Sequence, residues 1–368
     1  MHLAIIGTRG IPANYGGFET FAEELSKRLV ARGHEVTVYC RSHYVARSLK
    51  ECNGADLIVL PTLRYKYFDT VIHSLLSMLN AVPKRFDCVL VCNAANSPFI
   101  PILEWTGTPV AVNVDGLERH RKKWNALGRL YYALGERASL WFASRVVTDA
   151  RVIRDYYKER YGADTMLIAY GAEVERSAAP EILRKYDLES EKYILYVSRL
   201  EPENNAQMVI EAFRKLEIQQ PLVIVGDAPY ATRYKEHLRD LAAGDVRIRF
   251  LGSVYGAEKK ALEQNAAVYV HATEVGGTHP ALIEAMGAGN CCLVYDTPEN
   301  REVAADAGLY YSDSDSLAAL LRGVLSDGTL IGEYRRRAQD RVRENYDWET
   351  VTDEYERLFE RVVKNDDR

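Results

Sequence analysis

The sequence of 368 residues has no apolar run as long as a membrane-spanning helix, which needs roughly 18–20 residues. The segment from Met1 to Gly7 lacks basic residues and leads directly into a strand-like run, so we expect no signal peptide. The sequence also lacks a large excess of charge of either sign, because it has 47 Lys and Arg and 52 Asp and Glu. The resulting net charge of −5 argues against a protein that coats nucleic acid.

Metal-binding patterns are also missing. The six cysteines are scattered without zinc-ligand spacing, and Cys40, Cys88 and Cys92 lie in apolar, strand-like runs. The histidines are well separated and form no HxxxH-type pair. Asp313-Ser314-Asp315 resembles a metal-binding DxD, but it precedes a helical pattern over Leu317–Leu325, so helix capping is the better interpretation. We therefore predict buried, reduced cysteines, no metal and a cytoplasmic protein.

Short apolar runs alternate with helical patterns, and the pattern restarts after Gly171. This indicates an α/β fold with parallel sheets in two Rossmann-like domains, near the expected domain size. The expected strands of the first half are Leu3–Ile6, Glu35–Cys40, Asp56–Leu60, Asp87–Cys92, Pro109–Val114 and Arg145–Thr148. Those of the second half are Tyr193–Val197, Pro221–Val225, Val246–Leu251, Ala267–His271 and Cys291–Tyr295.

Helices are predicted by apolar residues at helical spacing. Phe18–Arg32 carries Phe21, Leu25, Leu29 and Val30 on one face. Further helices are predicted over Asn205–Leu216, Tyr230–Ala243 and Trp348–Val363, the last with Asp347 as N-cap. The polar stretch Val174–Glu191 is interpreted as a linker. We expect domains over residues 1–172 and 173–346, followed by a C-terminal segment over 347–368.

A glycine-rich loop, Gly7 to Glu19, follows the first strand and opens a helix. Glycines there let a ligand approach the backbone, and a helix N-terminus favours anions. The spacing of Gly7, Gly10 and Gly16 is not GxGxxG, and no Walker A lysine is present. A dinucleotide site is therefore weakly supported, and a tight turn without ligand is the alternative.

The second half carries a stronger ligand-binding pattern. Arg199, in Ser198–Asn205, follows a strand, where an arginine points toward the crevice of an α/β sheet and can hold phosphate. Gly276 and Gly277 follow a later strand, Pro280 suits the first turn of a helix, and Glu284 lies one turn inside it. Such a glutamate can accept hydrogen bonds from a ribose diol. The alternatives are a surface salt bridge for Arg199 and a solvated helical position for Glu284.

These residues resemble glycosyltransferase family 4, which has the GT-B fold, over nearly the whole chain. The segments that carry the resemblance are Gly16-Gly17, Gly33–Val38, Tyr196–Leu200, Pro202–Asn205, Val225–Asp227, Pro280–Met286, Pro298–Val303 and Tyr346–Trp348. The opening GTRGIPANYGGFET, the segment Asp115–Glu118 and the stretch Glu274–Pro280 resemble a narrower branch of bacterial rhamnosyltransferases that use dTDP-L-rhamnose.

The resemblance implies two Rossmann-like domains facing a central cleft, with the C-terminal helix crossing back to the N-terminal domain. It implies a nucleotide-sugar donor on the second domain and an acceptor on the first. Arg199 matches the diphosphate-binding Arg, whereas Asn204 stands at the usual Lys. Glu284 matches the ribose-binding Glu, whereas Gly276 replaces the Glu that contacts the donor sugar, and Glu274 lies two residues earlier. The donor-binding candidates are Gly16, Gly17, Arg199, Asn204, Gly276, Gly277, Thr278, His279, Pro280, Ala281, Leu282 and Glu284.

The first half supplies candidates for the acceptor. Asp115 ends a strand and precedes Gly116, so we predict that it contacts the acceptor hydroxyl; capping of a turn is the alternative. Asp115 and Arg199 are the catalytic candidates. Leu117–Arg160 holds 11 Lys and Arg against 5 Asp and Glu. It is either a solvated helical face or a contact for an anionic partner. The acceptor or membrane candidates are Glu118, Arg121, Lys122, Lys123 and Trp124.

Together these features predict a glycosyltransferase that needs no metal or other cofactor and is peripheral at the inner membrane face. We expect L-rhamnose transfer from dTDP-L-rhamnose to a glycan or lipid-linked saccharide, with retention, in polysaccharide biosynthesis. The alternatives are a UDP- or GDP-hexose donor, a nucleotide-sugar epimerase, and a non-catalytic nucleotide-sugar binding protein. The expected partners are the nucleotide sugar, the saccharide acceptor and an anionic membrane surface, but no nucleic acid.

Overall fold

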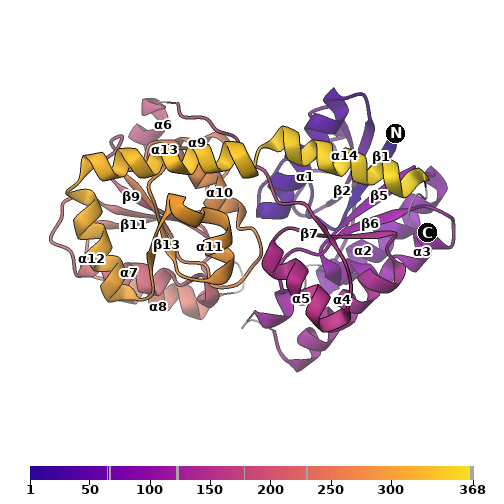
Figure 1. Ribbon diagram of the computed structural model, residues 1–368, viewed down its shortest axis with the longest axis horizontal. Helices are drawn as coiled ribbons and strands as arrows, with labels where there is room; N and C mark the ends of the chain where they lie inside the picture. Colours follow the sequence, from indigo (N-terminus) through magenta and orange to yellow (C-terminus); the bar gives the residue numbers. More distant parts are fainter. Residues whose placement is uncertain (64, 66–67, 122–123, 178, 229–230, 365–368) are drawn as a thin grey trace. The chain divides into compact units, whose positions relative to one another are not determined.

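The computed structural model describes residues 1–63, 65, 68–121, 124–177, 179–228 and 231–364. The chain divides into two compact units (Figure 1). Unit 1 comprises Met1–Tyr170 together with the C-terminal segment from Trp348, and unit 2 comprises Gly171–Asp347. Each unit contains one sheet of predominantly parallel strands, as the alternating sequence pattern predicts.

The sheet of unit 1 has the strand order β3-β4-β2-β1-β5-β6-β7-β8. All neighbouring strands pair in parallel except β3 and β4, which are antiparallel. The strands are β1 (His2–Ile6), β2 (Glu35–Arg41), β3 (Glu51–Cys52), β4 (Ala55–Leu60), β5 (Cys88–Cys92), β6 (Val110–Asn113), β7 (Arg145–Thr148) and β8 (Met166–Leu167). The central strands are buried on both faces, which explains their nearly continuous apolar sequence.

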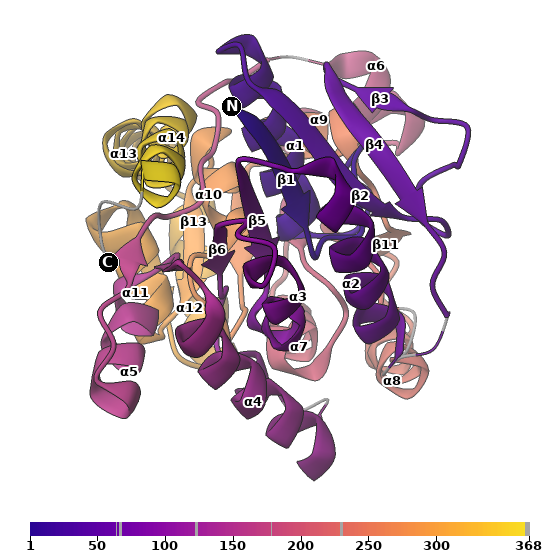
Figure 2. The same cartoon turned by 90° about the vertical axis from the view of Figure 1, so that its right-hand side faces the viewer.

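Helices cover both faces of this sheet. α1 contacts α14, and α14 also lies against β5 and β6. α2 and α4 both pack on the 3-10 helix η2, and α3 lies beside α2 (Figure 2). The helices are α1 (Gly17–Ala31), α2 (Phe68–Ala81), α3 (Pro101–Glu104), α4 (Ala126–Phe142), α5 (Arg151–Tyr161) and α14 (Trp348–Lys364), with 3-10 helices η1 (Val82–Lys84), η2 (Ala94–Phe99) and η3 (Glu118–His120).

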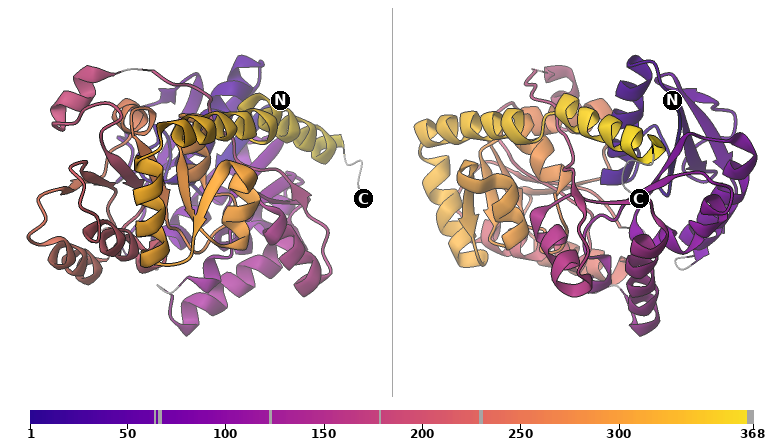
Figure 3. Two further views of the ribbon diagram at one scale, coloured as in Figure 1. Left: turned by 60° about the vertical axis from the view of Figure 1, so that its left-hand side comes forward. Right: turned by 45° about the vertical axis from the view of Figure 1, so that its right-hand side comes forward.

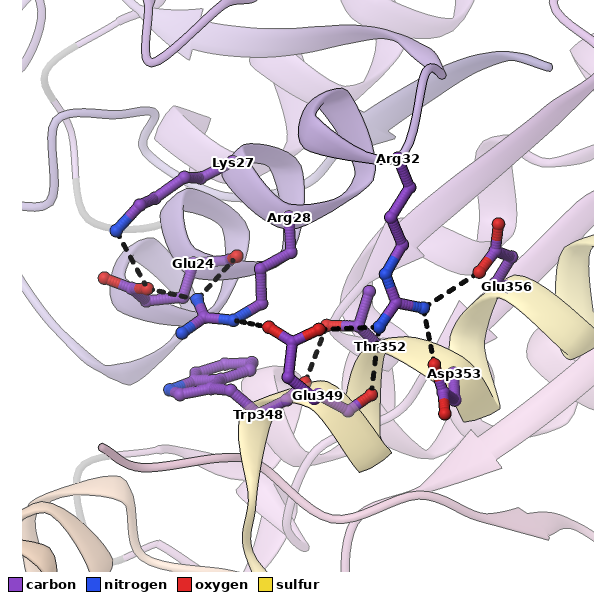
Figure 4. A network of polar contacts seen from close by, with 9 residues as sticks. All are labelled: Glu24, Lys27, Arg28, Arg32, Trp348, Glu349, Thr352, Asp353 and Glu356. Atoms are coloured by element: carbon purple, nitrogen blue, oxygen red, sulfur yellow. Dashed lines mark hydrogen bonds and ion pairs between the residues drawn. The ribbon is translucent and has the colours of Figure 1, made fainter. Parts of the chain in front are cut away.

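The last helix, α14, belongs to unit 1, which confirms the prediction from the family resemblance. Its buried ring Tyr355 packs on Phe21 of α1 at 5.3 Å between centroids. Around this apolar contact, Arg32 reaches three carboxylates of α14 (Figure 4). His34 contacts Glu356 of the same helix at 2.7 Å. The buried aromatic contacts supply most of the attachment, because exposed ion pairs contribute little each.

Unit 2 has a fully parallel sheet with the order β11-β10-β9-β12-β13-β14. Its strands are β9 (Ile194–Val197), β10 (Leu222–Val225), β11 (Ile248–Gly252), β12 (Val268–His271), β13 (Cys292–Tyr295) and β14 (Gly308–Tyr311). Its helices are α6 (Pro180–Lys185), α7 (Ala206–Arg214), α8 (Thr232–Ala242), α9 (Gly256–Gln264), α10 (Pro280–Gly287), α11 (Pro298–Ala304), α12 (Ser314–Leu325) and α13 (Gly328–Asn345), with 3-10 helices η4 (Pro202–Asn204) and η5 (Ala305–Ala307) (Figure 3).

The structure settles three smaller expectations. The stretch Val174–Glu191 is not an irregular linker throughout, because it contains α6, which buries Leu183 and packs on α9. Asp313 caps α12: its carboxylate accepts a hydrogen bond from Ser316 N at 2.7 Å. All six cysteines are free, and five of them are buried. The predicted start of the helix at Tyr230 lies outside the described residues.

Candidate functional site

The strand order of unit 2 locates a ligand-binding edge. Along the chain the sheet first grows from β9 to β10 and β11, and then resumes on the other side of β9 with β12. Ligands of such sheets bind beyond the carboxyl ends of the strands at which this reversal occurs. The two loops that leave those ends are residues 198–205, after β9, and residues 272–279, after β12. These loops contain Arg199, Gly276 and Gly277.

Hydrogen bonds join the two loops. Asn205 Nδ2 donates to Ala272 O at 3.0 Å, and Glu274 N donates to Glu203 O at 2.9 Å. Within the first loop, Asn204 Nδ2 donates to Arg199 O at 2.7 Å. The loops therefore form one connected rim rather than two independent turns.

Arg199 and Asn204 have different places in this rim. The Arg199 side chain retains 30% of its exposure, and its guanidinium lies 3.9 Å from the Glu201 carboxylate. Asn204 is buried, and Tyr196 Oη donates to its carbonyl at 2.6 Å. Asn204 thus holds the backbone that carries Arg199, and its side-chain nitrogen is already used for that purpose. Arg199 is the cation of this loop that is placed to meet a phosphate.

A histidine is enclosed in the second loop. His279 is buried, and its Nδ1 lies 2.7 Å from Asn300 Oδ1. Asn300 Nδ2 donates to two backbone carbonyls, those of Thr273 and Tyr295, so the amide oxygen faces the histidine. Because that oxygen only accepts, Nδ1 of His279 carries the hydrogen of this contact. The neighbouring His271 lies 3.3 Å away, and burial holds the pKa of His271 well below its ordinary value.

The same histidine explains the glycine at position 276. A Cβ added to Gly276 would stand 2.2 Å from His279 Nε2. The imidazole ring therefore fills the space into which a side chain at position 276 would extend. Since Asn300 and His271 hold that ring, it is not free to swing aside.

We expect Gly276→Glu to lower activity rather than improve the donor site. The new side chain must displace the His279 ring, which disturbs the rim and costs roughly 1–3 kcal/mol of stability, as overpacking commonly does. Thermal unfolding and donor titration of Gly276→Glu, His279→Gly and the double variant would measure this coupling. Losses in the double variant equal to the sum of the two single losses would contradict a steric conflict between the positions.

The helix that follows, α10, begins at Pro280 as predicted. Leu282 N and Ile283 N donate to His279 O at 2.9 and 3.2 Å, and the positive end of the helix dipole at this terminus suits an anion. Glu284, one turn further, is ion-paired with Lys259 of α9, and Lys259 also lies 3.1 Å from the buried Glu263. Sequence reasoning missed Lys259, because its two partners lie 4 and 25 positions away and only the folded helices bring all three together.

Glu263 makes this cluster sensitive to pH. Burial raises the pKa of Glu263 from 4.5 to about 7, the Glu284 carboxylate adds to the rise, and Lys259 opposes it. Between those values the folded chain keeps a proton that the unfolded chain loses, so stability falls as the pH rises through this interval. We expect Glu263→Gln to remove that component, which is on the order of 1–3 kcal/mol between about pH 5 and about pH 8. Urea unfolding at both pH values measures it; an unchanged difference between them would contradict the raised pKa.

The glycine-rich loop of unit 1 leaves the corresponding reversal point, between β1 and β5. It is packed tightly: a Cβ on Gly7 would stand 2.3 Å from Cys92 O, and Gly7 has a φ of +103°. Arg9 N donates to the buried Glu19 carboxylate at 2.8 Å, and the Arg9 guanidinium lies 3.5 Å from the centroid of the Tyr15 ring. Gly16 is the N-cap residue of α1. The loop thus presents a cation and an aromatic ring at this edge.

Asp115 follows β6 at the same edge of the sheet. Its backbone has a φ of +61°, a region that Asp and Asn tolerate better than most residues. Asn113 Oδ1 accepts from Asp115 N at 3.0 Å, and Asn113 Nδ2 in turn donates to Tyr355 Oη of α14 at 2.8 Å. Tyr170 Oη donates to the Asp115 carboxylate at 3.1 Å. Burial and the nearby Glu118 carboxylate raise the pKa of Asp115, which Arg121 and Tyr170 partly oppose.

Arg121, predicted to contact either the acceptor or the membrane, does not lie on an open surface, while its contact with an acceptor stays a prediction. Arg121 is 9% exposed and pairs with Glu118 at 2.5 Å. Trp124 is partly buried, with its ring 5.1 Å from that of Tyr132. Arg121, Glu118 and Trp124 therefore form a packed cluster beside Asp115, which excludes Arg121 from a solvated face. Lys122 and Lys123 lie outside the described residues.

Two broader features bear on the chemistry. In the part of the chain that the structure describes, no group of three or more His, Cys, Asp or Glu is arranged to hold a metal ion. Within the same residues, no helix is both long and apolar enough to cross a bilayer.

In comparisons with known protein families, the two halves of the chain match two different families. Residues 179–345 match the family described as glycosyl transferases group 1, and residues 1–173 match a domain of unknown function (DUF1972). The chain is 33% identical over 219 residues to a phosphatidyl-myo-inositol mannosyltransferase of Mycolicibacterium smegmatis, a match over 57% of this chain and 55% of the relative. It is 25% identical over 197 residues to an alpha-monoglucosyldiacylglycerol synthase of Streptococcus pneumoniae, over 49% of this chain and 44% of the relative.

The chain thus spans about half the length of the curated relatives it matches. Among solved structures, Anabaena Alr3699/HepE in complex with UDP-glucose superposes with a TM-score of 0.80 at 15% identity, over 97% of this chain and 98% of that one. At this identity the likeness shows the fold. The chain therefore has the GT-B fold, and its residues 179–345 match the family described as glycosyl transferases group 1.

Proposed function

We propose that this protein is a glycosyltransferase that binds a nucleotide-diphosphate sugar on unit 2 and transfers the sugar to an acceptor bound by unit 1. The observation that carries the proposal is the rim at the carboxyl ends of β9 and β12. There Arg199 is held by Asn204, and the N-terminus of α10 follows directly. A cation and a helix N-terminus at one sheet edge suit a diphosphate. Alr3699/HepE has the same fold and was crystallised with UDP-glucose.

In this proposal the leaving diphosphate carries the developing negative charge. Arg199 and the N–H groups at Gly277–His279 stabilise it, while the sugar passes through an oxocarbenium-like transition state. Glu284 binds the ribose and is kept in place by Lys259. No step requires a metal, and the stereochemistry of the anomeric carbon is retained, as the family resemblance implies.

We propose L-rhamnose from dTDP-L-rhamnose as the donor. The resemblance to the rhamnosyltransferase branch supports this, and so does the altered sugar side of the rim. There the His279 ring fills the space beside Gly276, where the family carries a carboxylate. A 6-deoxy sugar suits a pocket altered in this way.

For the acceptor we propose a lipid-linked saccharide at the inner face of the membrane. The names of two curated relatives describe transfer to phosphatidyl-myo-inositol and synthesis of a glucosyldiacylglycerol, which are both lipids.

The donor is tested by thermal unfolding in the presence of dTDP, UDP, GDP and their sugars. Ligands that bind only the folded state raise the unfolding temperature, and ligand at about 100 times its Kd adds about 2.7 kcal/mol of stability. We expect dTDP and dTDP-L-rhamnose to give the largest shifts. Selective stabilisation by UDP or GDP would overturn the rhamnose assignment, while stabilisation by none would overturn the donor site itself.

Because we propose that unit 1 binds the acceptor and unit 2 the donor, we expect Asp115→Asn to lower turnover without changing donor binding. Asparagine keeps the left-handed backbone conformation of Asp115 but cannot accept a proton from the acceptor hydroxyl. We expect kcat to fall by roughly 100-fold or more, within the range of general-base catalysis, while stabilisation by donor stays unchanged. Initial rates and donor titration measure the two effects. A variant that lost donor binding together with turnover would place Asp115 in the donor site instead.

A further inference from the structure

Helix α2 of unit 1 buries three polar residues beside Met78 and Ala81, and it exposes large apolar residues on its other side. His73, Ser74 and Ser77 are fully buried. Phe68, Leu75 and Leu79 are 52%, 37% and 52% exposed. A surface helix of a globular protein normally shows the opposite orientation. The apolar face of α2 therefore has to be explained by something other than the core of this unit.

The orientation of α2 is held by hydrogen bonds. His73 Nε2 lies 3.1 Å from Cys40 O, and Ser77 Oγ donates to His73 O at 2.7 Å. Ser74 Oγ lies within hydrogen-bond distance of Thr70 O and of Asn96 Oδ1 in η2, and its single hydrogen is shared between these two acceptors. Rotating α2 to bury its leucines would leave these polar groups facing the sheet without their partners, at a cost for each buried group. These hydrogen bonds therefore keep the leucines of α2 on its exposed side.

A second apolar stripe runs along α4. Leu127, Leu130, Leu134 and Trp141 are 74%, 66%, 47% and 64% exposed. Their spacing of three, four and seven residues places them on one side of the helix. α2 and α4 both pack on η2, with α3 beside α2 (Figure 2). We call the exposed side chains of these two helices the α2–α4 surface. Large apolar residues exposed along one side of a helix in this way mark an interaction site.

The charges of the α2–α4 surface indicate the kind of partner that it binds. Within these two fully described helices, Arg129 and Arg137 are the exposed charged residues. The acidic residues of the two helices are not exposed charges. Asp69 is paired with the buried Arg41 at 2.6 Å, and the buried Glu136 accepts from Tyr161 Oη at 2.6 Å. Leucine and tryptophan flanked by arginines suit the boundary between the headgroups and acyl chains of an anionic bilayer.

We propose that the α2–α4 surface docks on an anionic phospholipid bilayer. A second copy of this chain fits less well, because a two-fold contact would bring the arginines of both copies to one interface that offers them no exposed carboxylate from these helices. Membrane contact here replaces the buried Arg121 as the basis for peripheral association. The docking itself does not depend on the chemistry of the reaction.

One consequence rests on the proposed function. Asp115 follows β6, and α4 begins at Ala126, so the first turn of α4 and Asp115 belong to the same connection between β6 and β7. Docking through Leu127 and Leu130 would therefore bring the bilayer to the connection that carries Asp115. A lipid-linked acceptor would meet its proposed binding residue there without leaving the membrane.

The test is co-flotation of the full chain with vesicles of phosphatidylcholine alone or with about one third phosphatidylglycerol. The variants are Leu127→Gln/Leu130→Gln/Leu134→Gln, Arg129→Gln/Arg137→Gln, and Val246→Gln as the control, because Val246 is 91% exposed on unit 2. We expect the wild type and the control to bind anionic vesicles. The triple leucine variant should lose roughly tenfold or more in partitioning, and the arginine variant should lose its preference for anionic lipid.

Three results would overturn the proposal: a wild type that does not bind anionic vesicles, a triple variant that binds as well as the wild type, and a wild-type dimer that the triple variant dissociates while no form binds vesicles. The last would assign the surface to a second copy. Thermal shifts with the donor, recorded on the same variants, keep the two proposals apart. Vesicle binding without any donor shift would leave docking intact and remove the proposed function; a donor shift without vesicle binding would do the reverse.

Discussion

Replacing Arg199 by alanine is expected to lower kcat/KM by on the order of 100- to 1,000-fold, the usual cost of removing one group that stabilises a developing oxyanion. Nothing in the donor rim replaces this guanidinium easily, because Asn204 stands where the family resemblance implies a lysine. Asn204 is buried and bound to the Arg199 carbonyl. The rate is measured as release of nucleoside diphosphate from whichever donor stabilises the wild type.

The stability of the Arg199→Ala variant should stay close to that of the wild type. Its ion pair with Glu201 is long at 3.9 Å and partly exposed, and such pairs contribute little. Arg336→Ala is the matched control, since Arg336 also faces a carboxylate, Asp340 at 3.1 Å, but lies on α13 away from the rim. Arg199→Lys should recover part of the rate, because a lysine restores the charge but not the bidentate geometry. Wild-type turnover by Arg199→Ala would remove the residue from the proposed site.

The sheets could be predicted from the sequence because their strands are buried on both faces. Runs such as residues 222–225 are continuously apolar, and no surface requirement interrupts them. Several elements escaped for the opposite reason, α6 and β14 among them. α6 has a single buried leucine, Leu183, and β14 at the sheet edge includes Gly308, so neither shows a clear periodic pattern.

Part of the candidate site could likewise be predicted from the sequence, and part could not. Loops at strand ends could be located from glycines and from their place after apolar runs, which identified the segments around Arg199 and Gly276. The support beneath them could not, since Asn300 reaches His279 from 21 residues away and Lys259 reaches Glu284 from 25. Periodicity likewise indicates that a helix has two faces without saying which face meets the core. Which side of α2 is buried therefore required the structure.

Gly226 directly follows β10 and lies beside the Arg199 loop. Its φ is +133°, a region that side chains rarely adopt, and an added Cβ would stand 1.8 Å from Ser198 O. The atom in the way is backbone of the residue before Arg199, so relief requires the loop itself to move. We expect Gly226→Ala to cost about 3 kcal/mol or more, combining backbone strain with a steric clash.

Gly323→Ala supplies a control of the same chemistry with the opposite sign. Gly323 lies in α12 of the same unit, and an added Cβ there meets nothing within 4 Å. Alanine should stabilise that exposed helix by up to about 1 kcal/mol. Urea unfolding of both variants gives the two free energies, and donor titration of the folded Gly226→Ala chain reports on the Arg199 loop. A displaced loop must weaken donor binding even where the chain remains folded. A Gly226→Ala variant with reduced stability but unaltered donor affinity would therefore contradict a role in diphosphate binding for Gly226 and for the backbone of Ser198 and Arg199 that it supports.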